Sequence, residues 1–228
     1  NSRCKMIEEH YRSDYDGEFV ITNTIFKDGK KEQEREWVEN PISNKHYSDR
    51  ATCIADGISI EGFLLNRLEG HKGGLLGSLS MQVYGAQDVY KKLKCDFLVA
   101  LGQETLNEIK ESNYDVDNIV YTSTSGCLNN EGAFYLIPQS TRTTPHATAV
   151  WLACFDEHKE IFLFGYDEFN NDSIRQEKMI TSVEEVMKTY STVKFHHVYK
   201  NGDIPESWKY LPNIDSMTIN EYVSYADV

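Results

Sequence analysis

Residues 144–167 read TPHATAVWLACFDEHKEIFLFGYD and contain the strongest local signal in the chain. Thr144 is a good N-cap, and Pro145 suits the first helical position, where its missing N–H costs nothing. Apolar residues then recur with helical spacing, at positions 147, 150, 151, 154 and 155, which predicts an amphipathic helix with a core stripe. After a charged break, residues 160–164 read EIFLF, which is typical of a buried strand. The stretch therefore predicts a helix followed directly by a strand.

The same alternation of short apolar runs and helical periods extends in both directions from this unit. Strands are expected at 51–55, 75–78, 96–101, 119–122, 134–137 and 193–198, and helices at 61–69, 86–93, 104–111 and 182–190. Strands that alternate with helices imply right-handed crossovers and a parallel sheet that is covered on both faces. We therefore predict an α/β fold with a mostly parallel, Rossmann-like sheet and helices on both faces.

The two ends of the chain differ from the middle. Residues 18–39 combine a β-rich limb, the turn residues Asp28-Gly29 and a charged return limb, which predicts a hairpin. We expect three parts: an N-terminal β-hairpin extension (1–49), the Rossmann-like α/β domain (50–200), and an irregular acidic tail packed on that domain (201–228).

Composition limits the classes of partner. Among 228 residues, 23 Lys and Arg stand against 36 Asp and Glu, which gives a net charge of −13. Basic runs do not exceed Lys30-Lys31 and Lys91-Lys92, so a broad surface for nucleic acid or anionic membrane is disfavoured. No apolar run approaches the roughly 20 residues that span a bilayer.

The first residues and the cysteines indicate the cellular compartment. No hydrophobic stretch follows the first residues, from which we expect no secretory signal. The five cysteines include no CxxC pair, so neither a zinc site nor a disulfide framework is predicted. We therefore expect a cytoplasmic location, in which thiols stay reduced.

Polar side chains follow the predicted strands, and the carboxyl ends of parallel strands are where such sheets bind ligands. The candidate binding residues are Asp56, Gly57, Ser59, Ser80, Gln103, Thr144 and Tyr166, and the candidate catalytic residues are His146 and Asp167. Hydroxyl and amide groups dominate this set. It suits a polyol, a base and a ribose better than several bare phosphates.

Three of these positions have more than one interpretation. His146 lies in the first turn of the predicted helix, where the helix dipole disfavours an imidazolium, so it is either a neutral base or a histidine packed under a loop. Asp167 could bind a sugar hydroxyl, act as a base or cap the following turn. The turn at Asp56-Gly57 could hold a phosphate through backbone N–H groups, or be a plain connection between strand and helix.

Other motifs exclude some function classes. Neither GxGxxG nor GxxxxGK[ST] occurs, and no GxSxG supports a hydrolase. The two DxD sequences, at 14–16 and 115–117, precede apolar strands instead of ending them, so we predict no required metal. His196 and His197 point to opposite faces of one predicted strand, which indicates structural roles.

Several segments resemble the motifs of one known family. Residues 55–59 (ADGIS) and 93–99 (LKCDFLV) resemble the GxGPS … LKPDY halves of the bacterial sialyltransferase-like family, which includes lipooligosaccharide sialyltransferases. Residues 144–146 (TPH) and 158–167 (HKEIFLFGYD) are similar to that family's TSG … G-(Y/F)-K-E-I-Y-L-x-G-x-D. The resemblance covers about residues 50–208, and its final stretch carries most of the specificity.

This resemblance implies a metal-independent transferase that needs no cofactor and takes a nucleotide-activated sugar as its donor. The nucleotide would face the turn at Asp56, Gly57 and Ser59 and the region around Thr144. The family's catalytic histidine, which lies upstream of its TSG motif, has no counterpart in this sequence. His146 is therefore our candidate base on geometry alone.

We expect a glycosyltransferase that moves the donor sugar to a hydroxyl acceptor, with His146 or Asp167 removing the proton. The alternatives are a non-catalytic module of the same fold that binds a nucleotide or a protein, and a nucleotide-sugar hydrolase. The acidic chain with its hairpin also suggests a bacteriophage member of the family. A modified DNA base that bears a hydroxyl would then be a natural acceptor, and the host cytoplasm the location.

Overall fold

The computed structural model describes residues 7–12, 18–39, 48–69, 81–139, 142–170, 172–200 and 203–228. Ten strands of these residues form one sheet, in the order β10-β9-β8-β3-β4-β5-β6-β7-β1-β2. Eight of the strands run parallel: β3 (Arg50–Ile54), β4 (Gln82–Ala86), β5 (Phe97–Val99), β6 (Ile119–Thr122), β7 (Tyr135–Leu136), β8 (Glu160–Phe164), β9 (Lys194–Val198) and β10 (Ile214–Met217). The predicted α/β fold with a mostly parallel, Rossmann-like sheet is confirmed.

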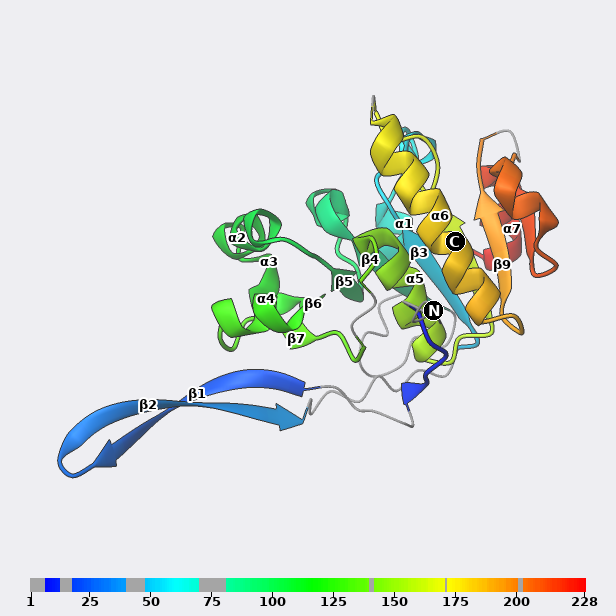
Figure 1. Ribbon diagram of the computed structural model, residues 1–228. Coiled ribbons are helices and arrows are strands. Elements are labelled where there is room, and N and C mark those ends of the chain that lie inside the picture. Colours follow the sequence, from blue (N-terminus) through cyan, green and yellow to red (C-terminus); the bar gives the residue numbers. More distant parts are fainter. Residues whose placement is uncertain are drawn as a thin grey trace.

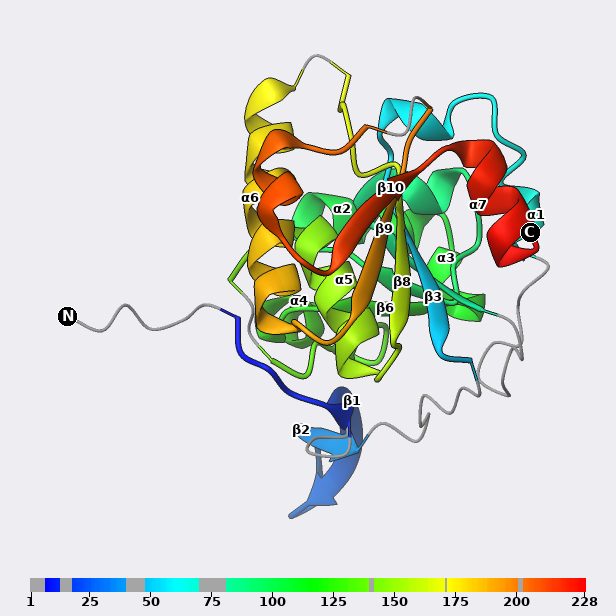
Figure 2. The ribbon, with the colours of Figure 1, turned by 90° about the vertical axis from the view of Figure 1, so that its right-hand side faces the viewer.

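Helices cover both faces of the sheet, as predicted (Figures 1 and 2). The α-helices are α1 (Asn66–Glu69), α2 (Gln103–Glu111), α3 (Tyr114–Asp117), α4 (Thr124–Asn129), α5 (Pro145–Phe155), α6 (Ser173–Thr189) and α7 (Ile219–Ala226), and short 3-10 helices are η2 (Ile58–Ile60), η4 (Gln87–Lys91) and η5 (Glu206–Tyr210). One face packs against α5 and α6, and the other against α2, α7 and the short helices that follow β3 and β4. No helix among these residues is long and apolar enough to cross a membrane.

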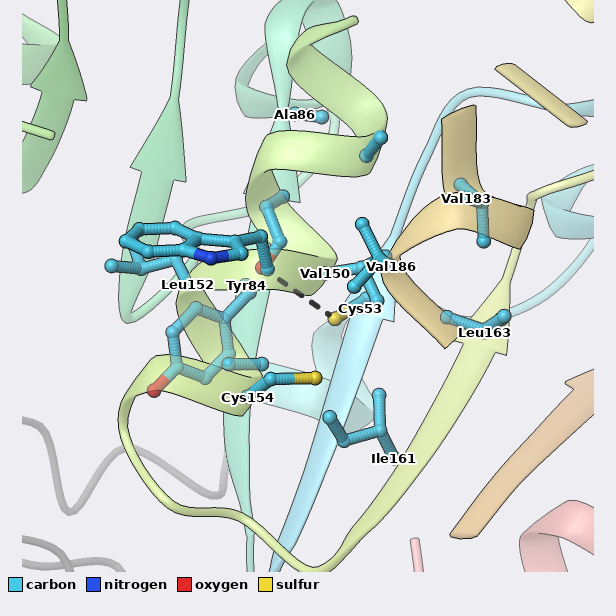
Figure 3. Close-up of a cluster of buried hydrophobic side chains, with 14 of the residues drawn as sticks. Cys53, Tyr84, Ala86, Val150, Leu152, Cys154, Ile161, Leu163, Val183 and Val186 are labelled. Carbon is cyan, nitrogen blue, oxygen red and sulfur yellow. Dashed lines mark hydrogen bonds between the residues drawn. The ribbon is translucent and has the colours of Figure 1, made fainter. Parts of the chain in front are cut away.

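The core on the α5 face explains why the sequence pattern of this helix was only partly informative. Cys53, Tyr84 and Leu163 of three neighbouring strands meet Val150 of α5 and Val183 of α6 (Figure 3). Helix α5 contacts β3, β4 and β5 of the sheet as well as α6, and the indole of Trp151 donates to the carbonyl oxygen of Glu8, so every residue from 146 to 155 is buried. The helix is therefore apolar all round, and the amphipathic helix predicted from its main stripe is wrong in that respect.

The N-terminal hairpin is confirmed and extends the sheet beyond the body of the molecule (Figure 1). Strands β1 (Glu18–Lys27) and β2 (Lys30–Glu39) pair antiparallel along their whole length. The turn residues Asp28 and Gly29 have φ of 52° and 75°, the positive values that a two-residue hairpin turn requires. Among the described residues, the strand pairing that joins this hairpin to the domain is Phe19 with Tyr135 of β7.

Some expected elements differ from those observed. The expected strand at 75–78 lies outside the described residues, and the strand next to β3 is β4, which the sequence pattern missed. Helix α6 begins at Ser173 instead of 182. The irregular tail expected at 201–228 is also wrong, because it contains η5, β10 and α7. Strand β10 escaped notice because it is a short edge strand whose two middle residues are exposed and polar.

The strand order reverses between β3 and β8. The chain proceeds from β3 through β4 to β7 in one direction, and α5 then returns it to β8 on the other side of β3. The N–H groups of Ala55 and Gly57, after β3, donate to the carbonyl oxygens of Phe164, the last residue of β8, and of Gly165, which follows it, at 3.0 and 2.9 Å. Parallel sheets bind ligands where the strand order reverses in this way. The fold therefore brings the loops of Asp56 and Asp167 to the expected edge of the sheet.

Gly165→Ala should destabilise the fold far more than Gly62→Ala. Both glycines have positive φ, 80° and 79°, which costs an alanine about 1 kcal/mol. A methyl group on Gly62 meets no atom within 4 Å, whereas one on Gly165 overlaps the carbonyl oxygen of Ala55. Urea denaturation should show losses of about 1 kcal/mol for Gly62→Ala and at least about 3 kcal/mol for Gly165→Ala. Equal losses would mean that the two loops do not approach as closely as described.

Candidate functional site

An open cleft of about 300 Å³ lies at the carboxyl ends of the central strands. The N-terminal residues of α5 and α6 form two of its sides, and the end of β4 contributes a third. The residues that line it are Gln87, Thr144, Pro145, His146, Asp172, Ile174, Arg175 and Lys178. The cleft therefore combines two cations, the carboxylate of Asp172, an imidazole, an amide and a hydroxyl beside one exposed apolar residue.

Three charged or titratable side chains meet at the buried edge of this cleft. Nη2 of Arg175 lies 3.0 Å from Oδ1 of Asp56 and 3.2 Å from Nε2 of His146. Nε2 of His146 lies 3.6 Å from the same oxygen of Asp56. His146 is 2% exposed, while the Arg175 side chain is 36% exposed and faces the cleft. We call Asp56, His146 and Arg175 the central trio.

The environment holds the trio in a defined charge state. Burial alone would raise the pKa of Asp56, but its contact with His146 and the guanidinium of Arg175 lower it to about 2. Burial lowers the pKa of His146, and the charge of Arg175 adds to this effect while Asp56 opposes it. At neutral pH the trio is therefore a carboxylate, a neutral imidazole and a guanidinium.

Local structure fixes the position of His146. Thr144 caps α5 by accepting a hydrogen bond from the N–H of Ala147 at 3.2 Å. The hydroxyl of Tyr166 donates to the carbonyl oxygen of His146 at 2.9 Å, and the ring of Phe169 lies against the imidazole with centroids 5.0 Å apart. Tyr166 is fully buried, so it positions His146 and does not face the cleft as a binding residue.

The backbone N–H groups of the turn after β3 already donate hydrogen bonds to other groups of the protein. Besides Gly57, the N–H of Ile58 donates to the carbonyl oxygen of Glu168 at 2.9 Å, and that of Ser59 donates to Oδ2 of Asp167 at 3.1 Å. Ser59 itself is buried. A phosphate at this turn would have to compete with these bonds, which differs from the expectation that Gly57 and Ser59 face the nucleotide.

Asp167 lies on the neighbouring loop but points away from the central trio. Its side chain contacts the Ser59 backbone, and it lines a separate pocket with His197 and Tyr199. Its other oxygen, Oδ1, has no hydrogen-bond partner among the described residues. Burial raises the pKa of Asp167 to about 6. Of the two candidate bases, only His146 lines the cleft.

The remaining candidates have separate positions. Gln103 begins α2 at the end of β5, where its amide donates to Asn107 and Asn130, and it is not among the residues that line the cleft. Thr144 lines the cleft and shares a hydrogen bond of 2.8 Å with Ser182 of α6. Ser80 lies outside the described residues.

Sequence reasoning missed the cationic side of the cleft, namely Arg175 and Lys178. Both belong to the part of α6 that precedes the expected start at residue 182. A signal for this part was present: Asp172 caps the helix by accepting from the N–H of Arg175 at 3.0 Å, and Arg175 precedes buried Met179 by one turn. An Arg in phase with a buried stripe could have indicated a partner carboxylate.

The arrangement supports acid–base chemistry next to a cationic patch. His146 has a neutral ring that can accept a proton, and Arg175 and Lys178 can bind an anionic group. The described residues include no group of three or more His, Cys, Asp or Glu side chains placed to hold a metal ion. Fold and site together define a Rossmann-like α/β protein with a polar cleft at its strand ends.

Comparisons with protein-family models, with curated proteins and with solved structures gave no match for this chain.

Asp167→Asn should stabilise the protein above pH 6. The carboxyl pKa is raised from 3.8 to about 6, so the folded state binds more protons than the unfolded state between these values, and stability falls as the pH rises through that window. Asparagine keeps an oxygen for the Ser59 N–H but cannot ionise. The free energy of unfolding should exceed that of the wild type by about 1–3 kcal/mol at pH 7.5 and match it near pH 4.

Glu168→Gln, an exposed neighbour, is the control and should show no such pH-dependent gain. An Asp167→Asn variant that is less stable at pH 7.5 would show that the carboxylate is needed for the fold.

Proposed function

We propose that this protein is a metal-independent glycosyltransferase that moves a sugar from a nucleotide-activated donor to a hydroxyl acceptor. The observation that carries the proposal is the buried His146, held beside Asp56 at the edge of a cleft that also presents Arg175 and Lys178. The chemistry needs a base for the acceptor and cations for the donor phosphates, and this cleft offers both.

In the proposed reaction, the acceptor oxygen attacks the anomeric carbon of the donor sugar. Its proton passes to Nε2 of His146, whose lowered pKa keeps the ring neutral and able to accept it. The bond between the anomeric carbon and the phosphate oxygen breaks, and its electron pair stays on the phosphate. The Asp56 carboxylate then lies 3.6 Å from the nitrogen that becomes charged, and stabilises the imidazolium.

The donor phosphate is proposed to lie between α5 and α6. The first residues of both helices line the cleft, and the positive ends of their dipoles favour an anion there. Arg175 and Lys178 add two cations, and they are separated by one helical turn on the same face of α6. Ile174 is 68% exposed at the mouth of the cleft and offers an apolar surface on which a base can lie.

A non-catalytic binding module remains the second candidate, and one observation favours it. The N–H groups of residues 57–59, where the resemblance predicts contacts to the nucleotide, are already bonded within the protein. A chain that lost this contact could keep the cleft of α5 and α6 as a binding site without turnover. The two candidates differ in whether His146 is needed for anything besides the fold.

A thermal-shift screen with uridine, cytidine, guanosine and adenosine diphosphates and their sugars tests the proposal. At a hundredfold excess over Kd, a ligand stabilises the folded state by about 2.7 kcal/mol. At least one nucleotide should raise the Tm, and Lys178→Ala should reduce that shift. Lys91→Ala, which removes an exposed lysine that lines another pocket, should not. No shift with any nucleotide would reject the proposal.

Turnover separates the two candidates. With the best nucleotide sugar, water or a hydroxyl acceptor should release free nucleotide. His146→Gln should lower that rate by at least about 100-fold and leave nucleotide binding intact, because a general base contributes 10²–10⁴-fold. His10→Gln, at a half-exposed histidine outside the cleft, is the control. Binding without turnover in the wild type would favour the non-catalytic module.

A further inference from the structure

The contact between Arg175 and His146 fixes which nitrogen of the imidazole carries the proton. A guanidinium has only donors, so its Nη2 at 3.2 Å can bond Nε2 only if that nitrogen is an unprotonated acceptor. The alternative, in which Nε2 donates to Asp56, would need a bond across 3.6 Å, which is too long. The neutral ring is therefore protonated at Nδ1, and the lone pair of Nε2 is occupied by Arg175.

Arg175 is held in place from three sides while staying open to the cleft. Its guanidinium donates to Asp56 at 3.0 Å and lies over the ring of Phe169, 4.4 Å from the centroid. Nevertheless 36% of its side chain is exposed, and it lines the cleft together with Lys178. A ligand that enters the cleft therefore reaches the guanidinium without any rearrangement of the backbone.

A phosphate group is a stronger partner for this guanidinium than the imidazole is. It offers two oxygens in the geometry of the guanidinium fork, and both hydrogen bonds are charge-assisted. The imidazole offers one neutral nitrogen. Because the same Nη2 makes both contacts, a guanidinium that turns toward the phosphate leaves Nε2 of His146, and it can bond Asp56 again through another of its five N–H groups.

We propose that Arg175 binds anions in the cleft and that, without an anion, its guanidinium blocks Nε2 of His146. A phosphate of the bound ligand bonds the guanidinium and thereby frees Nε2. The consequence for catalysis rests on the proposed function, whereas the binding of the anion and the release of the nitrogen do not. In a transferase this arrangement makes the order of binding obligatory. The base can accept a proton from the acceptor, or from water, only after the donor has bound.

Inorganic pyrophosphate is the probe, and the His146 ring signals in NMR spectra of the histidine-labelled protein are the readout. The charged groups that act on this ring are Asp56 after β3, Asp88 in η4 and Arg175 in α6. Removing the contact with the guanidinium favours the imidazolium, so the pKa of His146 should rise. We expect a rise of one unit or more with saturating pyrophosphate, and also in Arg175→Gln without any ligand.

The same variant tests the anion site. Pyrophosphate should bind Arg175→Gln at least tenfold more weakly than the wild type. Lys188→Gln removes a cation from the far end of the same helix and should change neither the affinity nor the His146 titration. Unchanged affinity in Arg175→Gln, or a His146 pKa that stays at its wild-type value in that variant, would overturn the proposal.

If Arg175→Gln does not fold, the His146 titration in the wild type is sufficient to test the proposal. A His146 pKa that does not change when pyrophosphate binds would show that Nε2 is still bonded to Arg175. The two proposals also fail separately. A His146 response to pyrophosphate without turnover of any nucleotide sugar would reject the glycosyltransferase and keep the anion-released base. Turnover in a protein whose His146 ignores pyrophosphate would do the opposite.

Discussion

The backbone contact between the loops after β3 and β8 determines where a ligand site can be. Gly57 and Gly165 lie so close that neither position has room for a side chain. The backbone N–H groups of the turn after β3, which could otherwise bind an anion, already donate to carbonyl oxygens of the loop after β8. Because Asp167 takes part in the same contact, its side chain does not reach the open cleft beside the N-termini of α5 and α6.

Electrostatics at the edge of this cleft follows from that arrangement. Asp56 belongs to the loop after β3, but its side chain takes no part in the backbone contact with the β8 loop. Its carboxylate is mostly buried beside His146. A buried carboxylate needs a partner, and Arg175 of α6 supplies it. The same guanidinium reaches the imidazole, so one residue links the stability of the carboxylate with the protonation state of His146. In a chain of net charge −13, Arg175 and Lys178 give this cleft a local cationic side.

Much of the fold was readable in the sequence because buried strands and helix caps leave strong local patterns. The helix at 145–155, the strand at 160–164 and the hairpin turn at Asp28-Gly29 are such cases. Strand β10 was not readable, since an exposed edge strand needs few apolar residues. The position of His146 beside Asp56 follows from strand order, whereas Arg175 was missed with the first turns of α6. The inward direction of Asp167 depends on the Gly57–Gly165 contact, which no local pattern encodes.

The most direct measurement of the site is a map of backbone amide shifts on addition of pyrophosphate. Because the anion is proposed to lie between the first turns of two helices, the largest changes should fall on His146 and on residues 173–178, with Gln87 beside them. The pocket formed by Lys91, Lys94 and Asn113 lies at the amino ends of the strands and should not respond. Changes confined to that pocket or to residues 57–59, or no changes at all, would contradict a ligand cleft between α5 and α6.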